Sequence, residues 1–229
     1  SVIGAAWLSA KPMRPADVFD AVVDGVRTMI STALLLVAVG IIINVVTTTG
    51  IGNAFSLMIV EWAQGSLFIT LVLVALASLV LGMGLPVTAS YIVLATLSAP
   101  LIYDLISQSA LLDAILIGIQ AGDLPNNVAA TLSLFGGDPL IALQEMPLEM
   151  KQLIRQEMLP SEQLTGMLLS AHLIIFWLSQ DSNVTPPVCL ASFAAAGIAG
   201  TNPMATGLTS WKVAKGLYLV PILFAYSPL

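Results

Sequence analysis

Charged side chains are what this sequence has least of. They make up 9% of its 229 residues, against 58% for apolar residues, whereas a soluble domain carries about 25% charged residues. The composition is therefore not that of a protein that folds in water. A formal net charge of −6 argues against nucleic acid as a partner, because nucleic-acid-binding proteins carry basic patches. Cys189 is the only cysteine, which excludes disulfides and thiolate metal sites within one chain.

The few charges are also segregated along the chain. No Asp, Glu, Lys or Arg occurs in the runs 28–60, 62–103, 163–180 and 182–211. A helix that spans a bilayer needs about 20 apolar residues, so each run is long enough to span it or nearly so. The sequence thus predicts an all-α, polytopic membrane protein. Because the chain begins without Met and ends inside an apolar run, we also expect it to be a piece of something longer.

The order of the runs predicts three parts. Residues 1–103 are expected to hold an amphipathic surface stretch, a first spanning helix, an interfacial helix and a hairpin, at 15–29, 28–46, 51–62 and 66–102. Residues 104–162 form a polar, acidic segment with a short membrane-associated helix at 105–122 and an amphipathic helix at 148–159. Residues 163–229 are expected to hold a spanning helix, its interruption, its continuation and a final span, at 163–180, 181–187, 188–199 and 213–229.

The hairpin is predicted from the shortness of its two arms, 66–81 and 88–102. Each covers about 24 Å or less at a rise of about 1.5 Å per residue, which is short of the hydrocarbon thickness of about 30 Å. Two short helices around a Gly/Pro tip favour a re-entrant hairpin over two separate spans.

The distribution of basic residues supports this topology. If the hairpin enters and leaves on one face, residues 1–27 and 200–212 share one side, and 47–65 and 104–162 share the other. The first side, extended to the foot of the last helix, holds most of the basic residues: Lys11, Arg14, Arg27, Lys212 and Lys215. Basic residues collect on the cytoplasmic side, so we expect a cytoplasmic N-terminus and an outward-facing 104–162.

The first break in the apolar pattern lies at 82–86, "GMGLP". Backbone that leaves helical geometry in hydrocarbon costs several kcal/mol per unpaired group, so it persists where it is buried in protein or lines a wet cavity. Gly82 and Gly84 would let the backbone approach an ion closely, and Pro86 opens a second helix with the hydroxyls of Thr88 and Ser90 near its N-terminus. The alternative is an ordinary loop at a helix end, and spacing alone does not choose between them.

The second break lies at 181–187, "DSNVTPP". Asp181, Asn183 and Thr185 supply oxygens, while Pro186 and Pro187 remove two backbone donors. A carboxylate at the centre of a spanning helix costs about 2.5–3.5 kcal/mol, so it needs a cavity, a partner or an ion. Asp181 at a membrane interface, where that cost nearly vanishes, is the alternative. The coincidence of Asp, Asn, Thr and two prolines favours a functional role.

His172 lies inside the apolar helix that leads to this break. A neutral histidine that hydrogen-bonds a neighbouring helix is the favoured interpretation, ahead of a proton relay.

The stretches "LGMGLPVTASYIVLATLSAPLI" and "DSNVTPPVCLASFAAAGIAGTNPMATG" closely resemble the large membrane component of tripartite ATP-independent periplasmic (TRAP) transporters. The closest likeness is to the fused permeases that work with TAXI-type solute-binding proteins. The resemblance implies an elevator-type, Na⁺-driven symporter in the cytoplasmic membrane of a bacterium or archaeon, which takes up small organic acids delivered by a periplasmic binding protein. Two inverted halves each carry a re-entrant hairpin and a broken helix, and this chain would be the C-terminal half, partnered by the N-terminal half.

The resemblance also implies site residues. The two breaks together would form one Na⁺ site, mainly from backbone carbonyls, at Gly82, Met83, Gly84, Pro86, Asp181, Asn183, Thr185 and Pro186. The adjoining substrate would contact Thr88, Ser90, Asp181 and Asn183. Na⁺ is then the coupling ion, and no other cofactor is expected. The long 104–162 segment departs from the family pattern, and we interpret it as a decoration rather than as a contact for the binding protein.

Other functions remain open to test. A Na⁺/carboxylate symporter without a binding protein would use the same broken helices. An intramembrane aspartyl protease is disfavoured because Leu85 occupies the Asp position of a Gly-x-Gly-Asp site, and no Gly-x-Ser-x-Gly motif accompanies His172, so we expect no enzymatic activity. A non-transporting membrane scaffold is the third alternative.

Overall fold

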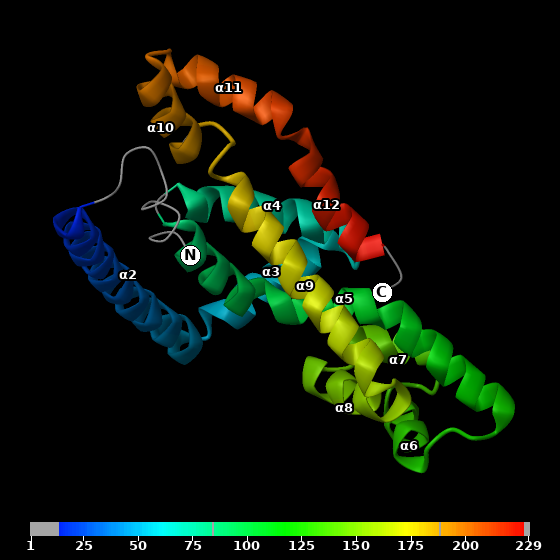
Figure 1. Ribbon diagram of the computed structural model, residues 1–229. Helices are drawn as coiled ribbons and strands as arrows, with labels where there is room; N and C mark the ends of the chain where they lie inside the picture. The colour runs from blue at the N-terminus through cyan, green and yellow to red at the C-terminus, as the bar shows by residue number, and fades with distance from the viewer. Residues whose placement is uncertain (1–13, 84, 188, 227–229) are drawn as a thin grey trace. The chain divides into compact units, whose positions relative to one another are not determined.

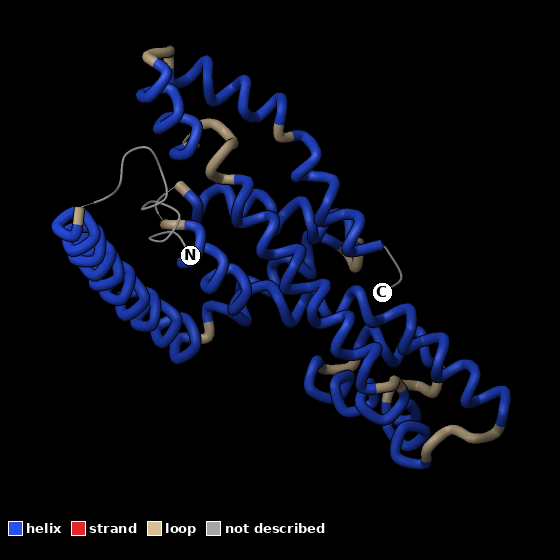
Figure 2. The backbone as a smooth tube through the Cα atoms, viewed as in Figure 1, coloured by secondary structure: helices blue, strands red, loops and turns tan. Residues whose placement is uncertain are grey.

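The computed structural model describes residues 14–83, 85–187 and 189–226. These residues form helices joined by turns, with no strand among them (Figures 1 and 2). The chain divides into two compact units, Ser1–Thr48 and Thr49–Leu229, which are described separately here. The prediction of an all-α protein is confirmed.

The first unit is the helix α2, Pro15–Thr49. Proline suits the first position of a helix because its missing N–H has no partner there, and the Asp17 carboxylate accepts the Arg14 N–H at 2.8 Å. The expected surface stretch 15–29 and spanning helix 28–46 form one continuous helix. Asp24 and Arg27 form an exposed ion pair, with 3.6 Å between Asp24 Oδ1 and Arg27 Nη1.

The second unit consists of helices joined by turns and short loops in its described residues. Its helices are α3 Ile51–Ala63, α4 Leu67–Gly82, α5 Val87–Ala121, α6 Asn126–Leu134, α7 Pro139–Glu145, α8 Leu148–Met158, α9 Ser161–Asp181, α10 Leu190–Ala199, α11 Pro203–Val213 and α12 Lys215–Tyr226. The interfacial and amphipathic helices expected at 51–62 and 148–159 correspond to α3 and α8.

The helices α4 and α5 form a hairpin whose turn lies where the sequence predicts it. Ser66 caps α4 by accepting the Ile69 N–H, and Pro86 precedes α5. The second arm, however, does not end at 102. It continues through Pro100 as one helix of 35 residues, so the prediction of a separate helix at 105–122 is wrong. Among the described residues, α5 is the helix long and apolar enough to cross a membrane.

A first core joins the hairpin to α9. It is built from buried apolar side chains of α4, α5 and α9, with Ile59 of α3 and Ala225 of α12 at its edges. Val74, Leu94 and Ile174 are fully buried in it. Buried side chains of this size make many van der Waals contacts, which together stabilise the packing of the helices. This core fixes the hairpin against the helix that carries the second break.

A second core explains why α5 is long. The distal half of α5 buries Leu111 and Ile115 against Val128 of α6, Leu143 of α7 and Ile154 of α8. We call residues 122–160 the helical cap. Gly122 ends α5 in the left-handed conformation, at φ 68°, which glycine adopts without strain. The cap therefore packs on α5 as a folded body, and the expected boundary between residues 103 and 104 falls inside a helix.

The C-terminal part follows the expected order except for one additional helix, α11, between the turn after α10 and the final helix. After the α9 break the chain forms α10, turns at Gly200, and continues as α11, which Asn202 caps by accepting the Ala205 N–H at 3.1 Å. The final helix α12 begins at Lys215. The predicted continuation of the broken helix at 188–199 corresponds to α10, and Val188 itself lies outside the described residues.

Candidate functional site

The two predicted breaks meet at Gly82 and Ser182. A Cβ atom added to Gly82 would lie 2.2 Å from Ser182 Cβ and 2.3 Å from Ser182 Oγ, distances that only a glycine at this position avoids. Gly82 is the last residue of α4, and Ser182 directly follows α9. Both are buried. The hairpin turn and the α9 break therefore lie against each other, although they are far apart in the sequence.

Polar contacts align α9 with both arms of the hairpin. One turn before Gly82, the Ser78 hydroxyl donates to the Leu178 carbonyl oxygen at 2.7 Å, and both groups are buried. On the other arm, the Tyr91 hydroxyl lies 3.1 Å from His172 Nδ1. The interpretation of His172 as a histidine bonded to a neighbouring helix is thus confirmed. These bonds hold the end of α9 at the hairpin turn.

Asp181 is the acidic side chain of the α9 break, and its carboxylate has no hydrogen-bond partner. It is the last residue of α9 and is 2% exposed. A buried, unpaired carboxylate is costly, so Asp181 is a candidate functional group. The alternative in which Asp181 sits at an open interface does not fit its burial.

The backbone after Asp181 turns tightly. The Asp181 carbonyl oxygen accepts hydrogen bonds from the Val184 N–H, at 3.2 Å, and from the Thr185 hydroxyl. The Tyr218 hydroxyl of α12 also bonds Thr185 Oγ1, and it is the donor because the Thr185 proton is already used. Since the Asp181 carbonyl is occupied by these bonds, the carboxylate is the more available oxygen donor for a cation. The other predicted residues of this break, Asn183 and Pro186, are half-buried.

The residues of the hairpin turn differ in exposure. Met83 is 43% exposed, and Pro86 and Thr88 are also exposed. Gly84 lies outside the described residues. Ser90 is fully buried, and its hydroxyl has no hydrogen-bond partner. Among these residues, Gly82 lies directly against Ser182 of the α9 break.

Two residues near the break were not predicted. Tyr218 bonds Thr185 from α12. Gly207 of α11 lies against the segment after the break: a Cβ there would be 2.4 Å from Cys189 Sγ and 3.8 Å from Pro186 Cγ. Tyr218 belongs to no local motif, and Gly207 ends the second stretch quoted in the sequence analysis without a role assigned to it there, so the tertiary fold identifies both.

A comparison with protein families identifies the chain. Residues 2–229 match the family model of the tripartite ATP-independent periplasmic transporter, DctM component. The chain belongs to this family. No curated protein and no solved structure matches it.

Membership of the DctM family confirms the resemblance to a TRAP large permease. The chain is accordingly an integral membrane component of a transporter. The exposed side of α4 agrees with this assignment, because it presents large apolar side chains at helical spacing: Phe68, Ile69, Val72, Leu76 and Val80. Contiguous apolar surface of this kind marks a membrane or protein contact.

Among the described residues of this DctM component, no three His, Cys, Asp or Glu side chains cluster so as to hold a metal ion. A cation at the break would therefore rely on the Asp181 carboxylate, on hydroxyls and on backbone carbonyls. Such oxygen ligands suit hard cations.

Proposed function

We propose that this DctM component is the permease half of a Na⁺-coupled secondary transporter in the inner membrane. It imports small organic acids that a periplasmic solute-binding protein of the TAXI type delivers, and it works with the N-terminal half of the same permease. The observation that carries the proposal is the buried, unpartnered carboxylate of Asp181, one residue from the contact between the α9 break and the hairpin turn.

The arrangement gives a physical basis for binding a cation. In secondary transporters, paired broken helices bring coupling-ion and substrate sites together near the bilayer midplane. A Na⁺ ion at Asp181 would neutralise a charge that otherwise costs free energy to bury. Hydroxyls and backbone oxygens from the two breaks would complete its coordination.

The start of α5 offers a place for the anionic substrate. Pro86 precedes this helix and its side chain makes no capping bond to the first N–H groups, and a helix N-terminus attracts negative charge. Ser90, in the second turn, contributes a buried hydroxyl without a partner. An organic carboxylate bound here would accept hydrogen bonds from the first N–H groups of α5 and from the Ser90 hydroxyl.

Coupling follows from the opposite charges of ion and substrate. A cation at Asp181 and a carboxylate at the start of α5 would each reduce the cost of burying the other, so the binding of one raises the affinity for the other. Such coupling is reciprocal and is typically worth about 1–3 kcal/mol.

Uptake by the intact permease tests the proposal. The full-length protein is reconstituted in liposomes with its binding protein, and accumulation of labelled organic acid is measured with an inward Na⁺ gradient or an equal choline gradient. We expect accumulation only with Na⁺ and only with the binding protein present. Accumulation without Na⁺ would contradict the coupling. Na⁺-driven accumulation without the binding protein would indicate the binding-protein-independent symporter instead.

A further inference from the structure

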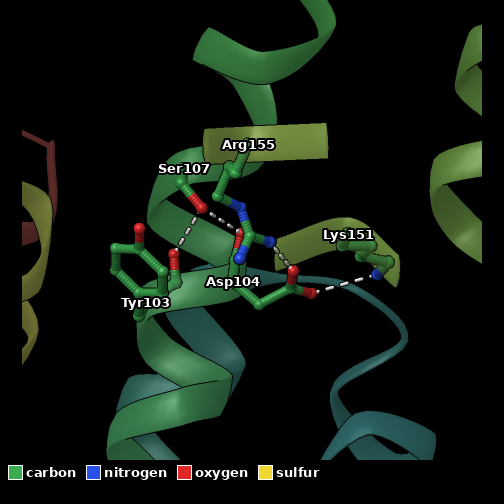
Figure 3. A network of polar contacts seen from close by, with 5 residues as sticks. All are labelled: Tyr103, Asp104, Ser107, Lys151 and Arg155. Carbon is green, nitrogen blue, oxygen red and sulfur yellow. Dashed lines mark hydrogen bonds and ion pairs between the residues drawn. The ribbon is translucent and has the colours of Figure 1, made fainter. Parts of the chain in front are cut away.

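A buried polar cluster joins the helical cap to α5 (Figure 3). Asp104 of α5 accepts Lys151 Nζ at 3.1 Å and also accepts Arg155 Nη2, both from α8. Asp104 is 5% exposed and Arg155 is 1% exposed. The Arg155 guanidinium lies 5.0 Å from the centroid of the Tyr103 ring. We call Asp104, Lys151 and Arg155 the Asp104 cluster.

The cluster lies next to the start of α9. The helix α8 ends just after Arg155, and the Leu159 N–H donates to the Arg155 carbonyl oxygen at 2.9 Å. Leu159 is buried, and Pro160 then leads directly into α9. Few residues separate Arg155 of α8 from the start of α9. The point at which Arg155 is held against α5 therefore determines where α9 begins.

The other end of α9 lies at the candidate cation site. The helix runs back along α5 toward the hairpin turn: α8, which directly precedes α9, is held at Asp104, while His172 in the middle of α9 bonds Tyr91 near the start of α5. From Ser161 to Asp181 the rise is about 30 Å, and from Val87 to Asp104 it is about 26 Å. The Asp104 cluster and the Gly82–Ser182 contact are thus the two ends of one antiparallel pair of helices.

We infer that the Asp104 cluster sets the axial position of α9 on the hairpin, so that the α9 break stays at the hairpin turn. Asp104, Lys151 and Arg155 are then positioning residues for the proposed cation site. The expected effect of the cluster on Na⁺ binding rests on the proposed function. Its effect on the position of α9 along the hairpin does not.

The chemistry of the cluster suits this role better than apolar packing would. Packed helices slide past one another in small shear motions, and apolar contacts tolerate such shifts. A carboxylate held by two cations does not, because a shift would leave a guanidinium buried without its partner, which is strongly destabilising. Replacing a whole buried ion cluster with apolar side chains is often neutral for stability. The cluster therefore contributes a fixed position more than it contributes stability.

The test replaces the whole cluster at once in the full-length permease. The triple variant Asp104→Leu, Lys151→Met, Arg155→Met leaves no charge buried, and its thermal unfolding shows whether it folds. Lys151→Met alone, which keeps the Asp104–Arg155 pair, is the milder variant. The matched control is Asp24→Leu, Arg27→Met, the same substitutions at an ion pair that is 75% exposed on both sides.

The first readout is independent of any ion. Spin labels are placed on cysteines at Leu76 of α4 and Leu169 of α9, both exposed, with the other cysteines replaced, and the distance between them is measured. We expect the distance distribution to shift or broaden in the triple variant, less so in Lys151→Met, and not in the control. An unchanged distribution in both cluster variants overturns the inference.

The second readout is the Na⁺ concentration for half-maximal uptake. We expect the triple variant to raise it by about tenfold, within the range of coupling by residues remote from a site, with the amount of folded protein unchanged. A merely structural role would lower that amount and leave the half-saturation unmoved, and this result would contradict the positioning role. If uptake by the unmodified permease shows no Na⁺ dependence, the proposed function fails, while the label distances still decide whether the cluster sets the position of α9.

Discussion

At the scale of single residues, the account depends on Gly82 and Asp181. Gly82 lets two backbones approach more closely than any other residue would allow, because a Cβ atom there would collide with Ser182. Asp181 carries a buried carboxylate whose oxygens have no partner. Such groups persist where function requires them, since each costs stability. Close approach and uncompensated negative charge thus coincide at the α9 break.

Substituting Gly82 tests the close approach. Gly82→Ala should separate the hairpin turn from the α9 break, lower the stability of the intact permease by about 1–3 kcal/mol through overpacking, and abolish Na⁺-driven uptake. Thermal unfolding and uptake are the measurements. Gly166→Ala is the matched control, because nothing lies within 4 Å of a Cβ at that position in α9, and alanine is favoured inside helices.

A compensating substitution makes this prediction sharper. Ser182→Gly removes the Cβ and the hydroxyl that the Gly82→Ala methyl group would meet. The double variant should therefore recover much of the stability lost in Gly82→Ala. Equal loss in the single and double variants would mean that the contact between turn and break is not what the alanine disturbs.

At the scale of elements, the sequence predicts the interruptions better than the long helix. The breaks at 82–86 and 181–187 are local signals, because glycine, paired prolines and an acid stand in apolar runs. The continuation of α5 is not local. Pro100 and Asp104 both suggest an end to the helix, but Asp104 is held by Lys151 and Arg155 of α8, more than 40 residues away in the sequence. The residues that neighbour Asp104 in the sequence do not reveal its ion pairs with α8.

The same reasoning explains which site residues were predicted. Asp181 and Gly82 belong to motifs that can be found in the sequence, and the fold brings their breaks together. Tyr218 and Gly207 reach the break only because α11 and α12 return to it. A tyrosine or a glycine in a helix does not by itself indicate that it lies near a functional site. Whether the hairpin is re-entrant stays a prediction, and the shortness of its second arm no longer supports it, because α5 is one helix of 35 residues.

The orientation of the cap is a prediction at this scale. The bias of basic residues places 104–162 outside and 200–212 inside. A cysteine at Asp138, which is exposed in the cap, should react with a membrane-impermeant thiol reagent added to the periplasmic side of whole cells. The matched control is a cysteine at Lys212, also exposed, which should react only after the membrane is opened. Labelling in the reverse pattern would overturn the topology.

At the scale of the whole molecule, the chain combines two cores that share α5. One core joins the hairpin to α9, and the other joins the cap to the distal half of α5. The interpretation of residues 104–162 as a decoration stays a prediction, and the structure adds that the cap is packed and ion-paired to the helix that forms one arm of the hairpin. As a DctM family member, the chain is a component of a tripartite transporter.

Equilibrium binding of radioactive Na⁺ to the purified full-length permease tests the central claim most directly. The account predicts saturable binding, weakened by about tenfold or more in Asp181→Asn, because an interaction with a charged group is worth about 1.5–3 kcal/mol. Asp113→Asn, an exposed carboxylate on α5, should leave the affinity unchanged. Equal Na⁺ affinity in the unmodified protein and in Asp181→Asn would contradict the claim that the two interrupted helices hold the coupling ion at Asp181.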